Sequence, residues 1–367
     1  MRISFLSGGR KPMRAAWLFV LCAAAGCRSS QPAAIDMKPA GQTTQAADDP
    51  DDPAIWVHPT DSSKSLILGT NKVKAPGGAL LVFDLSGAVR QTVSGLDRPN
   101  NVDIEYGFIL AGKETAIAVV TERLQSRLRV FRIDAGRGSL SDITSLGNTR
   151  VFTDRAGEQA APMGIGLYRR PRDGAIFAIV APKNGPLEGY LAQYRLEDDG
   201  QGLVKATFVR YFGRFSGGMA EIEAVAVDDP LGYVYYADEG DGIHKYLADP
   251  DHPDAARELA HFGRAGFQAD REGIAIHQRP DGTGYIVCTD QIAGNSEYRL
   301  HRREGEPGRP HDHERVVRIV RGGADSTDGI EITSRPLGPR FPSGLMVAMN
   351  STARNFLLFH AKDVIGE

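Results

Sequence analysis

The sequence predicts an all-β protein in which six similar units form a six-bladed β-propeller, and three observations lead to this fold class. The chain has 42 glycines and 21 prolines in 367 residues, which indicates many turns. From Asp48 onward, short β-prone runs are bounded by turn residues, and a helical period is almost absent. Six of these runs open with a similar acidic or glycine-containing signal at intervals of roughly 50 to 60 residues, which suits four-stranded propeller blades.

The six recurring runs are expected to be the innermost strands of the blades. They cover residues 52–57, 101–106, 163–168, 223–228, 272–277 and 328–332. In the first, second and fifth units a second strand is expected at 65–70, 116–120 and 284–288, and a third at 79–84, 128–133 and 298–302. The second strands are apolar on both faces, as expected for strands packed between neighbouring blades, and the third strands alternate. A two-sheet sandwich and two tandem β domains are the alternatives.

The first 47 residues are expected to lie outside the folded domain. Basic residues at positions 10, 11 and 14 precede an apolar run at 15–25 that is too short to span a bilayer stably, which indicates an export signal. The sequence Ala-Ala-Gly-Cys at 24–27 resembles the lipobox of bacterial lipoproteins. The resemblance implies that residues 1–26 are a lipoprotein signal peptide and that Cys27 is lipidated; an ordinary secretory signal is the alternative. Residues 27–47 are small and polar and predict a flexible tether, which leaves 48–367 as the domain.

Composition and cysteine content limit the partners and the location. A hydrophobic fraction of 41% and a formal net charge of −3 are ordinary for a globular protein and argue against nucleic acid as the main partner. Cys22 lies in the signal and Cys27 at the lipidation site, so Cys288 is the one thiol left, expected as a small core residue. We expect a monomer that is exported and held by lipid in the bacterial cell envelope, on the periplasmic side or at the cell surface.

Acidic residues recur where the innermost strands open, and four aspartates fall within residues 48–52. Taken alone, that stretch reads as a solvated acidic turn, but the ends of the innermost strands of a propeller converge at one mouth of its channel. The acidic residues that the fold would bring together are Asp51, Asp52, Asp103, Glu223, Asp270, Glu272, Asp325, Asp328 and Glu331. Clustered carboxylates indicate a hard cation and favour Ca²⁺ over Zn²⁺. The histidines do not recur at a metal-ligand spacing, which argues against a transition metal.

An ordered set of motifs resembles the β-propeller phytases. It begins with Asp-Asp-Pro-Ala-Ile-Trp-Val-His-Pro at 51–59, Gly-Thr-Asn-Lys at 69–72 and Asn-Asn-Val-Asp-Ile at 100–104. It continues with Asp-Arg-Glu-Gly at 270–273, Gly-Asn-Ser at 294–296, Asp-Ser-Thr-Asp-Gly-Ile-Glu at 325–331 and Gly-Pro-Arg-Phe-Pro-Ser-Gly-Leu at 338–345. The resemblance covers nearly all of the chain from residue 48 to about residue 359, and the order of its motifs makes it specific.

The resemblance implies a calcium-dependent phosphatase that hydrolyses phytate (myo-inositol hexakisphosphate) to lower inositol phosphates and phosphate. It implies several calcium ions at the channel mouth, some that hold the fold and others that bind substrate phosphates. Bound cations would reverse a field of carboxylates that otherwise repels phytate, and would activate a water molecule for attack. The sequence contains neither a Gly-x-Ser-x-Gly nucleophile motif nor a phosphate-binding Gly-Lys-Ser/Thr loop.

The resemblance also implies roles for individual residues. Catalytic calcium ligands are expected at Glu223, Asp270, Glu272 and Asp325. Further calcium ligands are expected at Asp52, Asn101, Asp103, Glu239 and Asn355, where Asp52, Asp325 and Asn355 would form a structural site that joins the first and last parts of the chain. Contacts to substrate phosphates are expected from Lys72, Arg123, Lys183, Gln291 and Asn295.

The chain departs from the family pattern at three places. Met163 stands where family members commonly have Tyr, and it has no hydroxyl to donate to phosphate. Val73 stands where they have a second Lys. Glu221 competes with Glu223 for one metal position, and the spacing of Glu223 to Glu239 favours Glu223. These departures bear on rate and substrate preference more than on the metal sites.

Two other functions are compatible with a propeller that gathers acidic residues. A calcium-dependent lactonase or esterase would use the carboxylates but would leave Lys72, Arg123 and Lys183 without a role. A non-catalytic, lipid-anchored binding propeller would explain the loss of phosphate contacts at Met163 and Val73. Phosphate release from phytate with and without Ca²⁺ distinguishes the three.

Overall fold

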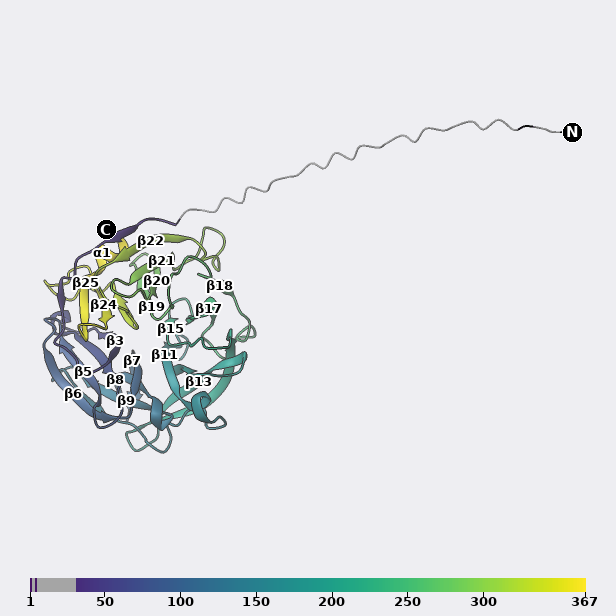
Figure 1. Cartoon of the computed structure of the whole chain (residues 1–367). Coiled ribbons are helices and arrows are strands. Elements are labelled where there is room, and N and C mark those ends of the chain that lie inside the picture. The colour runs from purple at the N-terminus through teal and green to yellow at the C-terminus, as the bar shows by residue number, and fades with distance from the viewer. Residues whose placement is uncertain (2–3, 5–30) are drawn as a thin grey trace. The chain divides into compact units, whose positions relative to one another are not determined.

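The computed structural model of the chain describes residues 1, 4 and 31–367. Residues 32–367 form one compact unit in which six β-sheets are arranged in a ring around a central channel (Figure 1). The fold is therefore a six-bladed β-propeller, and the prediction is confirmed. Cys27 and the apolar run before it lie outside the described residues.

The first four blades each use four consecutive strands. Blade 1 contains β3 (Pro50–Trp56), β4 (Leu66–Asn71), β5 (Gly78–Asp84) and β6 (Val89–Leu96). Blade 2 contains β7 (Pro99–Leu110), β8 (Lys113–Glu122), β9 (Arg127–Asp134) and β10 (Ser139–Asp142). Blade 3 contains β11 (Pro162–Arg169), β12 (Ile176–Pro182), β13 (Glu188–Asp198) and β14 (Val204–Arg214). Blade 4 contains β15 (Val225–Asp228), β16 (Tyr233–Asp238), β17 (Gly242–Leu247) and β18 (Ala260–Phe262).

The last two blades are completed by strands from the N-terminal part of the unit. Blade 5 contains β19 (Ile274–Gln278), β20 (Gly284–Asp290), β21 (Glu297–Arg302) and β22 (Val316–Arg321), with β1 (Ala34–Asp36) parallel to β22 at its outer edge. Blade 6 contains β23 (Ile330–Thr333), β24 (Leu345–Asn350) and β25 (Asn355–His360), and its fourth strand is β2 (Gly41–Gln42), antiparallel to β25. Residues 34–47, assigned above to the tether, therefore belong to the propeller, and the N-terminal segment closes the ring.

All six recurring runs form innermost strands, as predicted. Each innermost strand contacts those of both neighbouring blades, from β3 through β7, β11, β15, β19 and β23 back to β3. Glycines near the strand starts permit this approach. A Cβ on Gly164 would lie 2.2 Å from the carbonyl oxygen of Glu223, and a Cβ on Gly329 would lie 2.6 Å from the Cα of Asp52. The recurring glycine signal thus reflects close packing of backbones around the channel.

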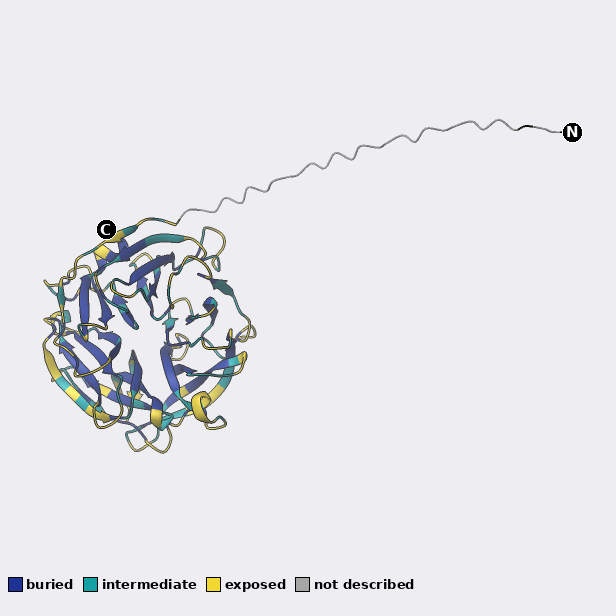
Figure 2. Cartoon of the chain, in the orientation of Figure 1, coloured by how far each residue is buried: buried dark blue, intermediate teal, exposed yellow. Residues whose placement is uncertain are grey.

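The hydrophobic core is divided among the six seams between blades. Six clusters of buried apolar side chains lie in the described part of the chain, one between each pair of neighbouring blades. The second strands β4, β12 and β24 are buried throughout, as expected for strands covered on both faces, and Figure 2 shows exposure concentrated in outer strands and loops. Cys288 is a buried free thiol in the seam between blades 4 and 5, as predicted, and burial raises its pKa to about 12.

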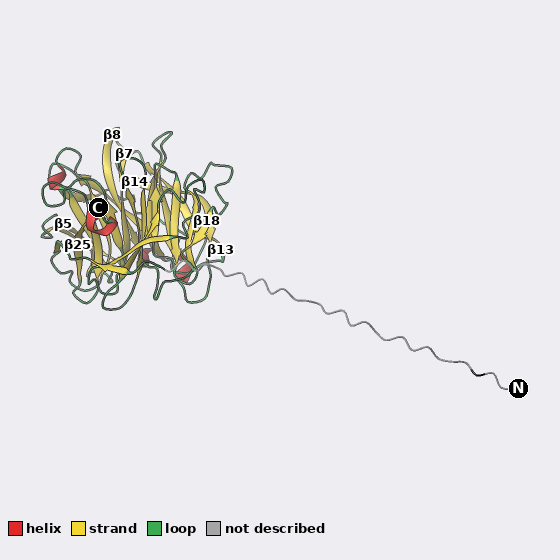
Figure 3. Ribbon diagram, turned by 90° about the horizontal axis from the view of Figure 1, so that it is seen from above, coloured by secondary structure: helices red, strands yellow, loops and turns green. Residues whose placement is uncertain are grey.

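In the part of the chain that the structure describes, helical structure is limited to short segments (Figure 3). They are η1 (Ser62–Lys64), η2 (Arg123–Gln125), η3 (Gly157–Ala160) and α1 (Ala361–Ile365). Within the described residues, none of the helices has the length and apolar character needed to cross a membrane.

Candidate metal and phosphate site

Three carboxylates from blades 4 and 5 meet at the channel mouth. Glu239 lies in the turn between β16 and β17, and Asp270 and Glu272 lie in the segment that leads into β19. Each offers one carboxylate oxygen, and the three oxygens lie within 4.8 Å of one another. All three are among the predicted metal ligands, and the structure brings them together.

The electrostatics of this group favour a bound cation. Glu272 Oε2 is buried and has no hydrogen-bond partner among the described residues. Burial, followed by repulsion from Glu223 and Glu239, raises the pKa of Glu272 well above its ordinary value. Burial likewise raises the pKa of Glu239 to about 8, and the nearby carboxylates of Glu221 and Asp270 add to the rise. A divalent cation would satisfy the free oxygen and offset the repulsion, and an all-oxygen donor set suits Ca²⁺.

Lys72 lies among a further set of carboxylates at the same mouth. Its Nζ is 2.5 Å from Asp51 Oδ1, 3.6 Å from Asp328 Oδ2 and 3.9 Å from Glu223 Oε2. Burial alone would lower the pKa of Lys72, but Asp51, Glu223 and Asp328 raise it well above its ordinary value, so the ammonium stays charged. Glu223 therefore lies near Glu239, Asp270 and Glu272, which we call the first carboxylate group, as its repulsion of Glu272 also indicates.

Two further predicted cations border the mouth. Arg123 in η2 donates to Asn100 Oδ1 at 3.1 Å, and Asn100 in turn donates to Asp51 and to Asn101. Burial lowers the pKa of Arg123, and the neighbouring Arg98 adds to this effect. The side chain of Lys183 is paired with Glu221.

Glu221 is tied to the first carboxylate group. Its backbone N–H donates to Glu239 Oε2 at 2.9 Å, and the Glu239 N–H donates to the Glu221 carbonyl oxygen. Glu221 thus pairs with Lys183, whereas Glu223 faces Lys72, so the two glutamates occupy different positions at the mouth.

The remaining polar residues predicted at the site divide into two groups. Gln291 donates to Asp328 and so joins the surroundings of Lys72. The Asp325 carboxylate accepts from Gly294 and Thr352, and the Asp325 N–H donates to Asn350 Oδ1. The side chain of Asn350 also donates to Asn355 Oδ1 at 3.0 Å. Asn295 Oδ1 accepts from the Gly323 N–H at 2.8 Å, on the loops of blades 5 and 6. Asp325, Asn295 and Asn355 therefore gather around the ends of these blades.

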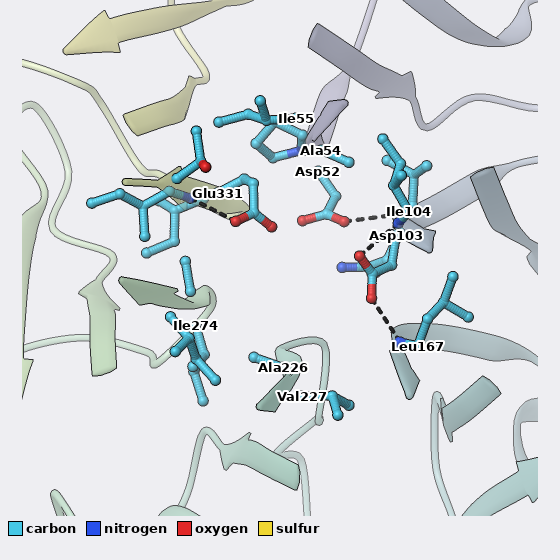
Figure 4. Close-up of a pocket in the computed structure, with 18 of the residues that line it drawn as sticks. Asp52, Ala54, Ile55, Asp103, Ile104, Leu167, Ala226, Val227, Ile274 and Glu331 are labelled. Atoms are coloured by element: carbon cyan, nitrogen blue, oxygen red, sulfur yellow. Dashed lines mark hydrogen bonds between the residues drawn. The ribbon is translucent and has the colours of Figure 1, made fainter. Parts of the chain in front are cut away.

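A third set of carboxylates lines the channel itself. A cavity of about 490 Å³ is lined by Asp52, Asp103 and Glu331, together with Glu105, Asp229 and apolar residues of the innermost strands. Figure 4 shows Asp52, Asp103 and Glu331 pointing into this space. Burial, followed by repulsion from Asp103, raises the pKa of Glu331 well above its ordinary value, and burial raises that of Asp103 to about 7.

The Asp52 carboxylate is engaged in the channel. Asp52 Oδ2 accepts from the Val102 N–H at 2.9 Å, and the Asp52 carboxylate lies beside Asp103 in the channel. The backbone N–H of Asp52 donates to Thr70 Oγ1 at 3.0 Å in the neighbouring strand β4. Asn101 lies between channel and mouth: it interacts with Asp52 and also donates to the Glu223 carbonyl oxygen at 3.4 Å.

Some residues of the mouth were not predicted as site residues. Asp51 and Asp328, which contact Lys72, were recognised only as acidic residues at strand starts, and Asn100 and Arg98 were not singled out. A signal for Asp51 existed, because it belongs to the same acidic strand start as Asp52. Nothing in the local sequence distinguishes Arg98 from a surface arginine.

Of the departures from the family pattern, Met163 is now placed. Its side chain is fully buried, and its carbonyl oxygen accepts from Thr121 Oγ1 at 2.6 Å. The Met163 side chain is a core group, so the mouth lacks a polar contact at this position.

Taken together, the mouth places carboxylates that can hold hard cations beside Lys72, Arg123 and Lys183. Such an arrangement can bind divalent cations and a highly anionic ligand at once, because the cations and the basic side chains both attract negative charge.

The chain is similar in sequence to known phytases. A family profile described as Phytase matches residues 15–355. A 3-phytase of Bacillus subtilis (strain 168) is 32% identical over 302 residues, which cover 82% of this chain and 74% of that protein. Among solved structures, the β-propeller domain of Cps50 (Swd1) from Myceliophteria thermophila is 12% identical with a TM-score of 0.45, covering 84% of this chain and 82% of that one. BBS1N in a complex with ARL6DN is 10% identical with a TM-score of 0.44, covering 84% and 78%.

Proposed function

The chain belongs to the phytase family of hydrolases, and from this membership we propose that it hydrolyses phytate to lower inositol phosphates and phosphate in a calcium-dependent reaction. The observation that carries the proposal is the convergence of Glu239, Asp270 and Glu272 within 4.8 Å at the same mouth as Lys72. Carboxylates alone would repel phytate, so the site needs cations to bind it.

The first carboxylate group would hold the catalytic cations. Glu239, Asp270 and Glu272 offer converging oxygens, and Glu223 lies close enough to Glu272 to raise its pKa. Bound calcium would supply positive charge that attracts substrate phosphates and polarises the phosphorus–oxygen bonds toward attack by water. The carboxylates themselves fix the position of that charge, because Glu239 is held by the Glu221 N–H.

The basic side chains would orient the substrate. The ammonium of Lys72 stays charged and is held in place by ion pairs with Asp51 and Asp328. It therefore presents a fixed positive charge at the mouth. Arg123 is held by Asn100, and Lys183 by Glu221. Gln291, beside Asp328, adds a polar contact, and Asn295 would act from the neighbouring loop.

Other predicted ligands would serve cations with a structural role. Asp52, Asn101 and Asp103 offer oxygens at the inner end of the mouth and in the channel. Asp325 and Asn355 are linked through Asn350 and would hold the loops of blades 5 and 6 together. The cation of Asp52 would be separate from that of Asp325 and Asn355, because the Asp52 carboxylate is engaged with Val102 in the channel.

We also infer that the protein acts outside the cytoplasmic membrane as a monomer anchored through lipidated Cys27. The support is the export signal and the lipobox-like residues 24–27. Replacing Cys27 by Ser should release the protein from the membrane fraction; a variant that stays membrane-bound would refute the anchor.

The deciding experiment measures phosphate release from phytate with and without Ca²⁺. We expect release that depends on Ca²⁺ and falls by at least about 100-fold in Glu272→Gln, since electrostatic stabilisation of phosphoryl transfer depends on the positioned charge. Glu114→Gln, at an exposed position at the start of β8, is the matched control and should retain activity. Release without Ca²⁺ would refute the metal dependence. Hydrolysis of a lactone in place of phytate would favour the lactonase, and inactivity toward both would favour a binding propeller.

A further inference from the structure

A second group of ligating side chains lies on blade 4, beside the turn that carries Glu239. His244 in β17 and His261 in β18 are direct partners across the antiparallel ladder, so their side chains share one face of the sheet. Asp241, in the turn before β17, completes the group. One ligand atom from each residue lies within 4.8 Å of the others.

Two imidazole nitrogens of this group make no hydrogen bond. His244 Nε2 and His261 Nε2 are buried and, among the described residues, accept or donate no hydrogen bond. The His244 side chain is only 3% exposed, and His261 Nε2 lies 3.4 Å from Asp241 Oδ2. A buried nitrogen lone pair without a donor is costly unless a ligand satisfies it, and it is the atom with which histidine binds metals.

Glu258 fixes the orientation of the His244 ring. Its Oε1 lies 2.5 Å from His244 Nδ1, so Nδ1 donates to the carboxylate, and in the neutral ring Nε2 then carries the free lone pair. A carboxylate behind a histidine in this way is the usual support of a metal-bound imidazole.

We propose that Asp241, His244 and His261 bind one divalent transition-metal ion of the Zn²⁺ type, at a site separate from the carboxylate groups of the mouth. Two imidazoles and one carboxylate select such metals over Ca²⁺, and three protein ligands leave one position for water. The Arg264 side chain, 3.4 Å from Asp241 Oδ1, would remain as a partner of the second carboxylate oxygen.

Binding requires one ring to turn. The His244 and His261 rings are stacked with centroids 4.2 Å apart and planes 9° from parallel. A metal lies in the plane of each ring that binds it, so two rings stacked face to face cannot share one ion. His244 is held between Tyr236 and His261 and by Glu258, whereas His261 is 21% exposed. His261 is therefore the ring that turns.

The site would brace the turn that presents Glu239 to the mouth. Asp241 follows Glu239 by two residues in the turn between β16 and β17. Arg271 ties the same elements together, because it donates to the Glu239 carbonyl oxygen at 2.8 Å and to the Arg264 carbonyl oxygen at 3.2 Å. An ion at Asp241 and His261 would add a second link between this turn and β18.

The test uses Co²⁺ as a spectroscopic probe, in excess Ca²⁺ so that the all-oxygen sites are filled. We expect the exported protein to bind one equivalent of Co²⁺ with the intense visible absorption of a tetrahedral ion, and Zn²⁺ to displace it. His261→Gln should abolish this absorption. Glu258→Gln should weaken the affinity about 10- to 100-fold, as loss of the group behind a ligand does.

A matched variant and a folding measurement make the outcome decisive. His252→Gln replaces an exposed histidine of the preceding loop and should leave Co²⁺ binding unchanged. Thermal unfolding of His261→Gln in Ca²⁺ shows whether its fold is intact. Co²⁺ binding by folded His261→Gln that equals the wild type would overturn the proposal, as would a wild-type protein that takes up no Co²⁺ in excess Ca²⁺. Neither readout depends on phosphate release, so the result is independent of the proposed function.

Discussion

Replacing Glu239 by Gln should stabilise the protein in chelator and destabilise it in calcium. In the metal-free protein, burial and the neighbouring carboxylates Glu221, Glu223 and Asp270 raise the pKa of Glu239 to about 8. The folded state therefore binds a proton that the unfolded state releases between pH 4.5 and 8, and the stability of the metal-free protein falls as pH rises through that interval. Gln has no such proton and keeps the oxygen that accepts from the Glu221 N–H.

The magnitude follows from the pKa. For each pH unit above the ordinary pKa of a glutamate, keeping Glu239 in its folded environment lowers the free energy of unfolding by about 1.4 kcal/mol. At pH 7 the full loss would be roughly 3 kcal/mol. Because Glu239 is partly exposed, solvent screening reduces this to about 1–2 kcal/mol. Glu239→Gln should therefore raise Tm in chelator by about 2–4 °C at pH 7 and leave it unchanged near pH 4.5.

Calcium should reverse the order of stability. A cation that binds only the folded state adds about 2.7 kcal/mol at one hundred times its Kd, and the variant loses part of this because it lacks one ligand. The assay is thermal unfolding of both proteins at pH 4.5, 7 and 8, in chelator and in Ca²⁺, with Glu114→Gln as an exposed control. A variant that is less stable than the wild type in chelator at pH 8 would refute the reasoning, since Glu239 would then contribute stability without any cation.

Three further predictions concern the charge of Lys72, the removal of metal ions and the N-terminal strands that complete the last two blades. Lys72→Met should lower kcat/KM for phytate by about 10- to 1,000-fold, because it removes the cation beside three carboxylates, while the exposed Lys113→Met should change it less than twofold. Chelation of the wild-type protein should lower Tm by several degrees, and an unchanged melting curve would count against cations that hold the fold. A protein that begins at Ala47 should be less stable than one that begins at Gln31 by about 3–5 kcal/mol, because it lacks both N-terminal strands; equal urea midpoints would contradict this.

The fold was largely predictable because each blade repeats the same local signals. An acidic or glycine residue before a β-prone run marked all six innermost strands, and the structure shows that Gly164 and Gly329 allow the backbones to approach. The strands β1 and β2 could not be predicted in the same way. They are three and two residues long, lie in a small and polar stretch, and pair with strands that lie far away in the sequence, as in the pairs Ala34–Ile319 and Gly41–Leu358.

The site was predictable only in part, because motifs identify residues and not the directions in which they point. The resemblance to a family placed Glu239, Asp270 and Glu272 in one group, and the structure brings them together. The same resemblance gives no direction for Asp52, whose carboxylate turns into the channel while its neighbour Asp51 contacts Lys72. That difference depends on strand orientation, which a list of matched positions does not contain.

The histidines of blade 4 also show that sequence spacing does not reveal which side chains meet in the fold. Seventeen positions separate His244 from His261, so no short metal-binding spacing marks them, and the sequence argued against a transition metal. The register of β17 and β18 makes them direct partners, and the turn before β17 adds Asp241. The length of the connection between the two strands is immaterial once the register is set, because cross-strand partners are neighbours at any loop length. A set of metal ligands on two paired strands is therefore identified from the strand register and not from sequence spacing. In blade 4 such a set lies next to the turn that places Glu239 at the mouth.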